Sequence, residues 1–240
     1  MDHAAATRQA PGWALDEVAS AGRENLDPGH VARYDAKEDA GAEAELAVLS
    51  RLGLDGRSVV VDLGAGTGQF TVAAARECAR VVAVDVSPVM MRLLADKVAA
   101  AGLTNVELVQ AGFLTYEHRG RPADVVYSRF ALHHLPDFWK AVAIERVRRV
   151  LRPGGVFRLS DVVYGFDVAV AEERLEAWCA TGGDAVEGAW SRAEIEEHVR
   201  DEHSTFTWLL EPMIERCGFV IDDAAYSDDG LFARYVARAR

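Results

Sequence analysis

Cysteine is scarce in this sequence, and the three that occur, Cys78, Cys179 and Cys217, lie far apart. They form neither the closely spaced pairs that ligate zinc nor a disulfide framework, a pattern that suits a reducing compartment. Long apolar runs are missing too, because no stretch approaches the roughly 18 residues of a membrane-spanning helix. The first residues lack the basic and apolar regions of a secretory signal. These absences predict a cytoplasmic protein that makes no use of a membrane.

Positive charge is also in short supply, with 26 Lys and Arg against 38 Asp and Glu and a formal net charge of -12. Such a balance repels a polyanion, so nucleic acid is excluded as the main partner. His198 and His203 lie five residues apart among acids, a spacing that does not place two ligands on one helix face. We therefore expect a solvated surface there and no metal site.

What the sequence does contain is an alternation of short apolar runs with helical segments. Strands are expected at residues 58–64, 80–87, 106–110, 123–128 and 156–163, the first two of them buried, and helices at 69–79, 87–103 and 138–155. Continuous apolar strands separated by helices indicate a parallel sheet covered on both faces. Residues 206–219 read as a helix, followed by an antiparallel strand pair at 220–227 and 231–239.

The domain organisation follows from where this alternation starts and breaks. Residues 1–40 are predicted to form an N-terminal arm and cap, loosely held up to about residue 28. Residues 41–240 form one domain, with a helical lid inserted at about 165–205. Trp178, Trp190 and Trp208, in and after this insertion, are expected mainly to pack its own small core.

Three glycines, Gly64, Gly66 and Gly68, follow the first strand. Strand, glycine-rich turn and helix open the nucleotide-binding half of a doubly wound fold, although a mere tight turn is the simpler alternative. Asp85 ends the second strand about 20 residues further on, where a carboxylate can accept both ribose hydroxyls. The dinucleotide and Walker patterns are both incomplete, since Gln69 holds the last glycine position and no Gly-Lys follows.

Asp62, beside the glycine loop, narrows the choice of nucleotide. Its charge would repel the pyrophosphate of NAD but attract the amino group and the sulfonium of S-adenosylmethionine (SAM). Opposite charges about 4 Å apart gain roughly 4 kcal/mol at an effective dielectric of 20, before desolvation.

Four stretches together carry a family resemblance: VVVDLGAGTGQF, VVAVDVSPVMM, ADVVYSRFALHHLPD and RVLRPGGVFRLSD. Over residues 59–163, about half the chain, the sequence resembles the class I SAM-dependent methyltransferases, and within them bacterial enzymes that act on small molecules. The resemblance implies a Rossmann-like, doubly wound sheet of seven strands, mostly parallel with the last antiparallel. It also implies SAM as methyl donor and a small-molecule substrate over the carboxyl-end edge, with a homodimer as an option.

The resemblance also assigns cofactor contacts. Asp62, Gly64, Ala65 and Gly66 match positions that hold the methionine part of SAM, and Asp85 matches the ribose carboxylate. The remaining matches are Val86 and Met90 beside the adenine, and Ser128 and Arg129 beside the sulfonium. Gly112 and Phe113 stand where the family usually has a polar acceptor for the adenine amino group. Phe113 either covers the base or fills the core.

Candidate catalytic residues follow the fourth and fifth strands. His133 and His134 are predicted to supply a base for a hydroxyl acceptor, with Asp161 as orienter or substrate contact. The alternative is that one histidine packs against the next helix and the other is solvated. We therefore expect methyl transfer to oxygen, nitrogen or carbon of a small molecule. A SAM-binding protein that does not methylate is the main alternative, and an NAD-dependent redox enzyme is a weaker one.

Overall fold

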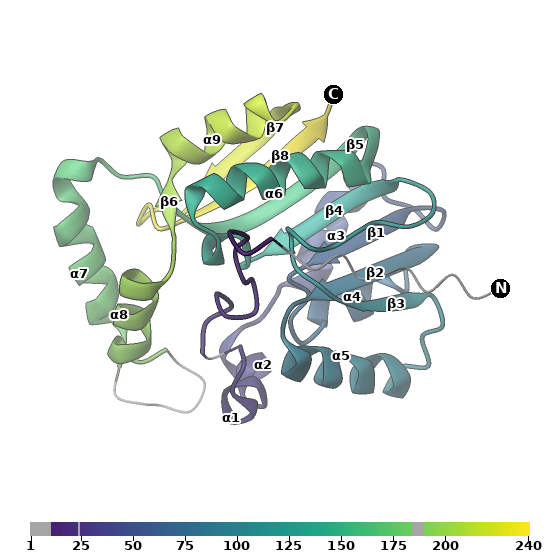
Figure 1. Ribbon diagram of the computed structural model, residues 1–240, viewed down its shortest axis with the longest axis horizontal. Helices are drawn as coiled ribbons and strands as arrows, with labels where there is room; N and C mark the ends of the chain where they lie inside the picture. Colours follow the sequence, from purple (N-terminus) through teal and green to yellow (C-terminus); the bar gives the residue numbers. More distant parts are fainter. Residues whose placement is uncertain (1–10, 24, 184–189) are drawn as a thin grey trace.

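A central sheet organises the computed structural model, which describes residues 11–23, 25–183 and 190–240 (Figure 1). Within these residues the strands are β1 (Val59–Leu63), β2 (Arg80–Asp85), β3 (Val106–Gln110), β4 (Ala123–Arg129), β5 (Leu151–Tyr164), β6 (Thr205–Phe206), β7 (Phe219–Tyr226) and β8 (Phe232–Ala239). Their order is β3-β2-β1-β4-β5-β8-β7, with β6 paired to β5 beside this path.

Strands β1 to β5 pair in parallel, and β8 runs antiparallel to both of its neighbours. The predicted doubly wound sheet with an antiparallel last strand is therefore confirmed. The two-residue strand β6 was not predicted, because so short a segment carries no period of its own. All parallel strands end at one edge, so the loops that follow them meet there.

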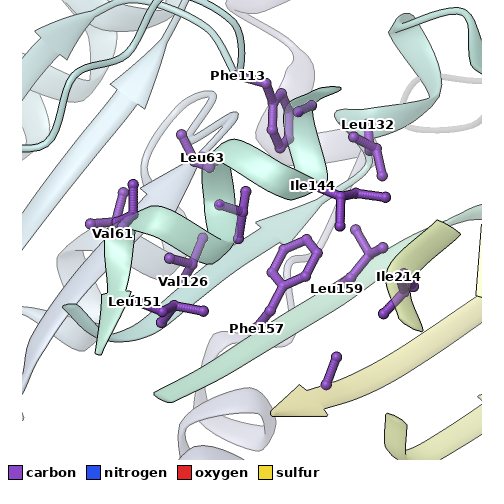
Figure 2. Packing of buried hydrophobic residues seen from close by; sticks show 14 of the residues in the cluster. Val61, Leu63, Phe113, Val126, Leu132, Ile144, Leu151, Phe157, Leu159 and Ile214 are labelled. Atoms are coloured by element: carbon purple, nitrogen blue, oxygen red, sulfur yellow. The ribbon is translucent and has the colours of Figure 1, made fainter. Parts of the chain in front are cut away.

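Helices cover both faces of the sheet. The described helices are α1 (Pro28–Val31), α2 (Tyr34–Lys37), α3 (Ala42–Arg51), α4 (Gln69–Ala74), α5 (Pro88–Ala100), α6 (Asp137–Val150), α7 (Ala171–Thr181), α8 (Arg192–Asp201) and α9 (Thr207–Arg216), with single turns η1 (Leu132–His134) and η2 (Val168–Val170). Val61 and Leu63 of β1 face the core that contains Ile144 of α6 and Ile214 of α9 (Figure 2). Val60 faces the opposite core, under α3 and α4. This alternation is what a strand buried on both faces requires.

The junction of α6 and β5 differs from the prediction. Residues 153–155, expected to stop the helix before a strand at 156, lie inside β5, which starts at Leu151 directly after α6. Leu151 pairs with Ala123, and the register then shifts before Val125 pairs with Val156. Pro153 has no N–H to donate. It lies between Leu151 and Val156, where the pairing of β5 with β4 is interrupted and no hydrogen bond from its nitrogen is needed.

The described part of the N-terminal arm, residues 11–23 and 25–27, is packed against the domain rather than loosely held. Glu17 and Ala21 are buried, and Ser87 donates a hydrogen bond of 2.5 Å to the carbonyl of Asn25. Residues 1–10 and residue 24 lie outside the described part of the chain. Glu17, Ala21 and Asn25 therefore hold this part of the arm against the edge of the sheet, while residues such as Trp13 and Val18 are exposed.

The insertion after β5 carries η2, α7 and α8, which lie to one side of the sheet (Figure 1). Ser191 begins α8 with a reciprocal capping box to Glu194. None of the helices described in the structure is long and apolar enough to span a bilayer.

Candidate active site

A cavity of about 80 Å³ lies at the carboxyl ends of the parallel strands. Nine of the residues predicted from the sequence line it: Gly64, Gly66, Asp85, Val86, Met90, Gly112, Phe113, Arg129 and His134. They come from the segments after β1, β2, β3 and β4, so the sheet topology alone brings them together. The N-terminal region also contributes to this wall, through Glu17, Ala21, Asn25 and Tyr34.

Asp85 organises the glycine loop. Its two carboxylate oxygens accept hydrogen bonds from the backbone N–H of Gly66 at 2.9 Å and of Ser87 at 2.7 Å. Burial raises the pKa of this carboxyl, although the backbone donors act against that effect. Gly66 has φ +53 and open space where a side chain would project, whereas a side chain at Gly68 (φ +83) would overlap Leu94. The loop thus needs glycine at both positions, for different reasons.

Three predicted cofactor residues, Asp62, Ala65 and Ser128, are not part of this cavity wall. Asp62 is buried behind the glycine loop, where Thr71 donates a hydrogen bond of 2.5 Å to it. Burial raises the pKa of Asp62 to about 7. Ser128 is fully buried on β4, and its hydroxyl has no hydrogen-bond partner among the described residues. Their contact with a cofactor stays a prediction.

Phe113 fills the core, one of the two roles considered for it, and its contact with the base stays a prediction. It is buried in the core beside Leu63 and Ile144 (Figure 2), and it also forms part of the cavity wall. Gly112 has no room for a side chain, because a Cβ there would overlap the carboxylate of Glu17 and lie 2.7 Å from Val86. No motif marks Glu17 in the sequence, so it could be found only from the fold.

A second cavity, of about 1070 Å³, lies between the sheet edge and the insertion. Both cavities are lined by Asn25, Tyr34, Arg129, Phe130 and His134. Trp178 and Trp190 line the larger one rather than packing only against the insertion, while Trp208 is 57% exposed. Phe130 is held at φ +50, an uncommon conformation for an aromatic residue, at the junction of the two cavities.

His133 is enclosed by carboxylates. Its Nδ1 lies 2.5 Å from Asp161 and its Nε2 lies 2.9 Å from Glu202, and all three side chains are largely buried. Burial alone would lower the pKa of His133, but the charges and hydrogen bonds of Asp161 and Glu202 outweigh it and raise the pKa to about 10. His133 is therefore an imidazolium at neutral pH.

Asp161 lines neither cavity. Besides His133 Nδ1, it accepts hydrogen bonds from the backbone N–H groups of Leu132 and His133, so it fixes the turn that carries both histidines. The structure thus favours the role of orienter over that of substrate contact.

His134 is partly buried, and its Nε2 lies 3.4 Å from the side-chain nitrogen of Asn25. Burial, strengthened by the positive charge of His133, lowers the pKa of His134 to about 3. Its Nδ1 has no hydrogen-bond partner in the described part of the chain. A neutral imidazole therefore lies where the two cavities meet.

His198 and Glu202, one turn apart on and after α8, were not recognised as a pair in the sequence. His198 is not on a solvated surface, as its spacing from His203 suggested, but packs against His133 and Trp178. His133, His198 and Glu202 bring potential metal-ligand atoms within 4.8 Å of one another. His133 Nε2 and Glu202 form an ion pair at 2.9 Å, and that carboxylate oxygen has no hydrogen-bond partner among the described residues.

Comparison with known proteins identifies the family. Residues 60–155 match the model of a methyltransferase domain. The protein YafE of Escherichia coli is 32% identical over 178 residues, which cover 74% of this chain and 77% of YafE. The chain belongs to the class I SAM-dependent methyltransferases.

Solved structures agree on the fold of this enzyme. Phosphoethanolamine N-methyltransferase 2 of Haemonchus contortus, in complex with SAM, superposes with a TM-score of 0.69 at 17% identity, covering 96% of this chain and 61% of that one. The cyclase SpnF gives a TM-score of 0.62 at 19% identity, covering 83% and 81%. The enzyme uses SAM as its cofactor.

Family membership gives the two histidines different chemical meaning. A base for the acceptor of this enzyme must be able to take a proton, and His133 already carries one. The prediction that His133 acts as a base is therefore not supported by its surroundings, because two carboxylates hold it protonated. His134 can accept a hydrogen bond from the group that is to be methylated. Its low pKa makes it a weak base before the methyl group is transferred.

Proposed function

We propose that the enzyme transfers the methyl group of SAM to oxygen, nitrogen or carbon of a small molecule bound in the larger cavity. The observation that carries this proposal is the junction of the two cavities at Arg129, Phe130 and His134. A cofactor in the smaller cavity, with Asp85 at its ribose, would present its methyl group toward this junction. The predicted cofactor-binding and catalytic residues would then surround the same methyl transfer.

The reaction is a single displacement at the methyl carbon. A lone pair of the acceptor forms the new bond, the S–C bond breaks toward sulfur, and S-adenosylhomocysteine leaves. The acceptor's proton, where it has one, passes to His134 or to water. Holding the two reactants in line can supply roughly 7–11 kcal/mol of the barrier, so orientation is the main contribution of this site.

The walls of the larger cavity indicate the size and kind of acceptor. Its volume is in the range of pockets for small molecules. The aromatic side chains Phe130, Trp178, Trp190 and Phe232 favour an acceptor with a flat or apolar part. Five acidic residues border it, against two arginines: Asp27, Glu38, Glu194, Glu197, Glu202, Arg23 and Arg129. Glu38 pairs with Arg129, Glu194 with Lys37 and Glu202 with the charged His133, so the net charge around the cavity is small.

The insertion at about 165–205 serves in this proposal as a lid over the acceptor. It contributes Trp178 and His198 to the wall opposite the sheet edge, and Lys37 of α2 pairs with Glu194 of α8 at 2.6 Å. This ion pair links the cap to the lid.

An assay for S-adenosylhomocysteine formation across a panel of amines, phenols and enolisable metabolites tests the proposal. We expect turnover with members that combine an apolar part and a nucleophilic group with a free lone pair. The alternative, a SAM-binding protein that does not methylate, predicts SAM binding by calorimetry with no methyl release from any member. The structural likeness to SpnF, a [4+2]-cyclase, is the reason for testing this alternative.

A further inference from the structure

The N-terminal arm brings a buried carboxylate to the wall of the cofactor cavity. Glu17 is 8% exposed and lines the cavity with Val86, Met90 and Gly112. One carboxylate oxygen accepts a hydrogen bond from Leu114 N–H at 3.0 Å, and the other accepts one from the hydroxyl of Thr115 at 2.9 Å. Glu17 is thus fixed to the segment after β3, although it lies almost 100 residues away in sequence.

Gly112 makes this placement possible. A side chain at this position would overlap the Glu17 carboxylate and would lie 2.7 Å from Val86. The Gly112 N–H donates to the hydroxyl of Thr115, the residue that in turn donates to Glu17. A carboxylate from the arm therefore occupies the place that a side chain of the segment after β3 would otherwise fill.

We propose that the Glu17 carboxylate accepts a hydrogen bond from the exocyclic amino group of the SAM adenine. This inference rests on the cofactor position proposed above, in which Asp85 holds the ribose and the base extends along Val86 and Met90. A carboxylate offers about four acceptor directions, and among the described residues Leu114 and the Thr115 hydroxyl each use one of them. The adenine amino group supplies the N–H donor that a half-satisfied buried carboxylate lacks.

The small volume of the cavity raises an alternative role for Glu17, that of filling the adenine position in the absence of ligand. About 80 Å³ is the share of only a few water molecules, so the arm has to shift outward when a nucleoside enters. If Glu17 merely filled the adenine position, its removal would open the site to any purine. If it reads the amino group, its removal would change which purine is preferred.

Calorimetry with two ligands separates these readings. S-adenosylhomocysteine carries the amino group, and S-inosylhomocysteine carries a carbonyl oxygen in its place. We expect the wild type to prefer the adenosyl ligand by about 10- to 100-fold, the range of a hydrogen bond to a charged group. Glu17→Gln should reduce this preference to a few-fold, because the glutamine amide can donate to the carbonyl. Glu17→Ala should also lose the preference, through weaker binding of the adenosyl ligand.

Each variant provides its own reference, because the ratio of two affinities does not depend on the fraction of folded protein. A ratio that stays at the wild-type value in both variants would overturn the role of Glu17. Equal tightening of both ligands in Glu17→Ala would also overturn it, in favour of a plug. Asp85→Ala is the control for cofactor position and should weaken both ligands by the same factor. If it weakens neither, the cofactor position itself is wrong and the inference falls with it.

Discussion

At the scale of single residues, the site depends on carboxylates whose hydrogen-bond partners are brought to them by the fold. Asp85 lies where its position at the end of β2 predicted, and it also holds the Gly66 N–H. Asp85→Ala is expected to weaken SAM binding by about 10- to 100-fold, since hydrogen bonds to a charged group contribute roughly 1.5–3 kcal/mol. Calorimetry with SAM measures this. Asp223→Asn, an exposed carboxylate on β7, is the control and should bind as the wild type does. Unchanged affinity in Asp85→Ala would remove this residue from the site.

The pair of Asp161 and His133 predicts a pH dependence of stability. The pKa of His133 is raised in the folded state, to about 10, above its unfolded value of about 6.5. Its contribution to the free energy of unfolding is therefore complete below about pH 6.5 and is lost as pH rises through 10. Asp161→Asn should cost about 3–5 kcal/mol near neutral pH, as expected when a buried pair is broken. Calorimetric melting between pH 6 and 10 should show a shallower loss of stability in the variant. Parallel curves for variant and wild type would contradict the assignment.

At the scale of elements, the glycine loop and the turn η1 set the geometry of the reaction. A left-handed conformation costs a residue with a side chain about 1–2 kcal/mol. Gly66→Val should therefore remain folded but lose SAM binding, because its side chain enters open space on the cavity wall. Gly68→Val should melt at a distinctly lower temperature, because its side chain also overlaps Leu94 of α5. Circular dichroism and calorimetry measure both properties. Normal SAM binding by a folded Gly66→Val protein would refute the role of the loop.

The turn η1 presents His134 at the cavity junction. We expect His134→Ala to lower kcat on an acceptor with an N–H or O–H group while SAM affinity stays the same, and His134→Gln to retain part of the rate by accepting a hydrogen bond. Since the pKa of His134 is lowered to about 3, this residue should add no inflection to the rate profile between pH 6 and 9. An inflection in that range that disappears in His134→Ala would show that it acts as a full base.

The elements that the sequence predicts well are those whose apolar period is continuous. Buried strands such as β1 and β2, and the capped helix α5, needed only local information. The register shift in β5 and the two-residue β6 depend on partners far along the chain. The same division holds for the site. Asp85 and His134 follow strands and could be found from motifs, whereas Glu17 and Glu202 reach the site through tertiary packing that no local pattern encodes.

At the scale of the whole molecule, the arm, the sheet edge and the insertion enclose two adjoining cavities. The arm lines the smaller cavity, proposed for the cofactor, through Glu17 and Asn25, and the insertion lines the larger one, proposed for the acceptor, through Trp178 and His198. Changes on one side should therefore affect one ligand more than the other. Trp178→Ala is expected to raise the KM of the acceptor by roughly 10-fold or more, as loss of an aromatic contact area predicts, and to leave SAM affinity within a few-fold.

The most direct test of methyl transfer between the two cavities is a rate measurement on three proteins. Formation of S-adenosylhomocysteine is followed for the wild type, Gly66→Val and Trp178→Ala with an acceptor from the panel. The account predicts turnover by the wild type, none by Gly66→Val because SAM does not bind, and turnover with raised acceptor KM but unchanged SAM affinity by Trp178→Ala. Equal rates in wild type and Gly66→Val, or a SAM affinity that falls in Trp178→Ala as much as the acceptor KM rises, would contradict it.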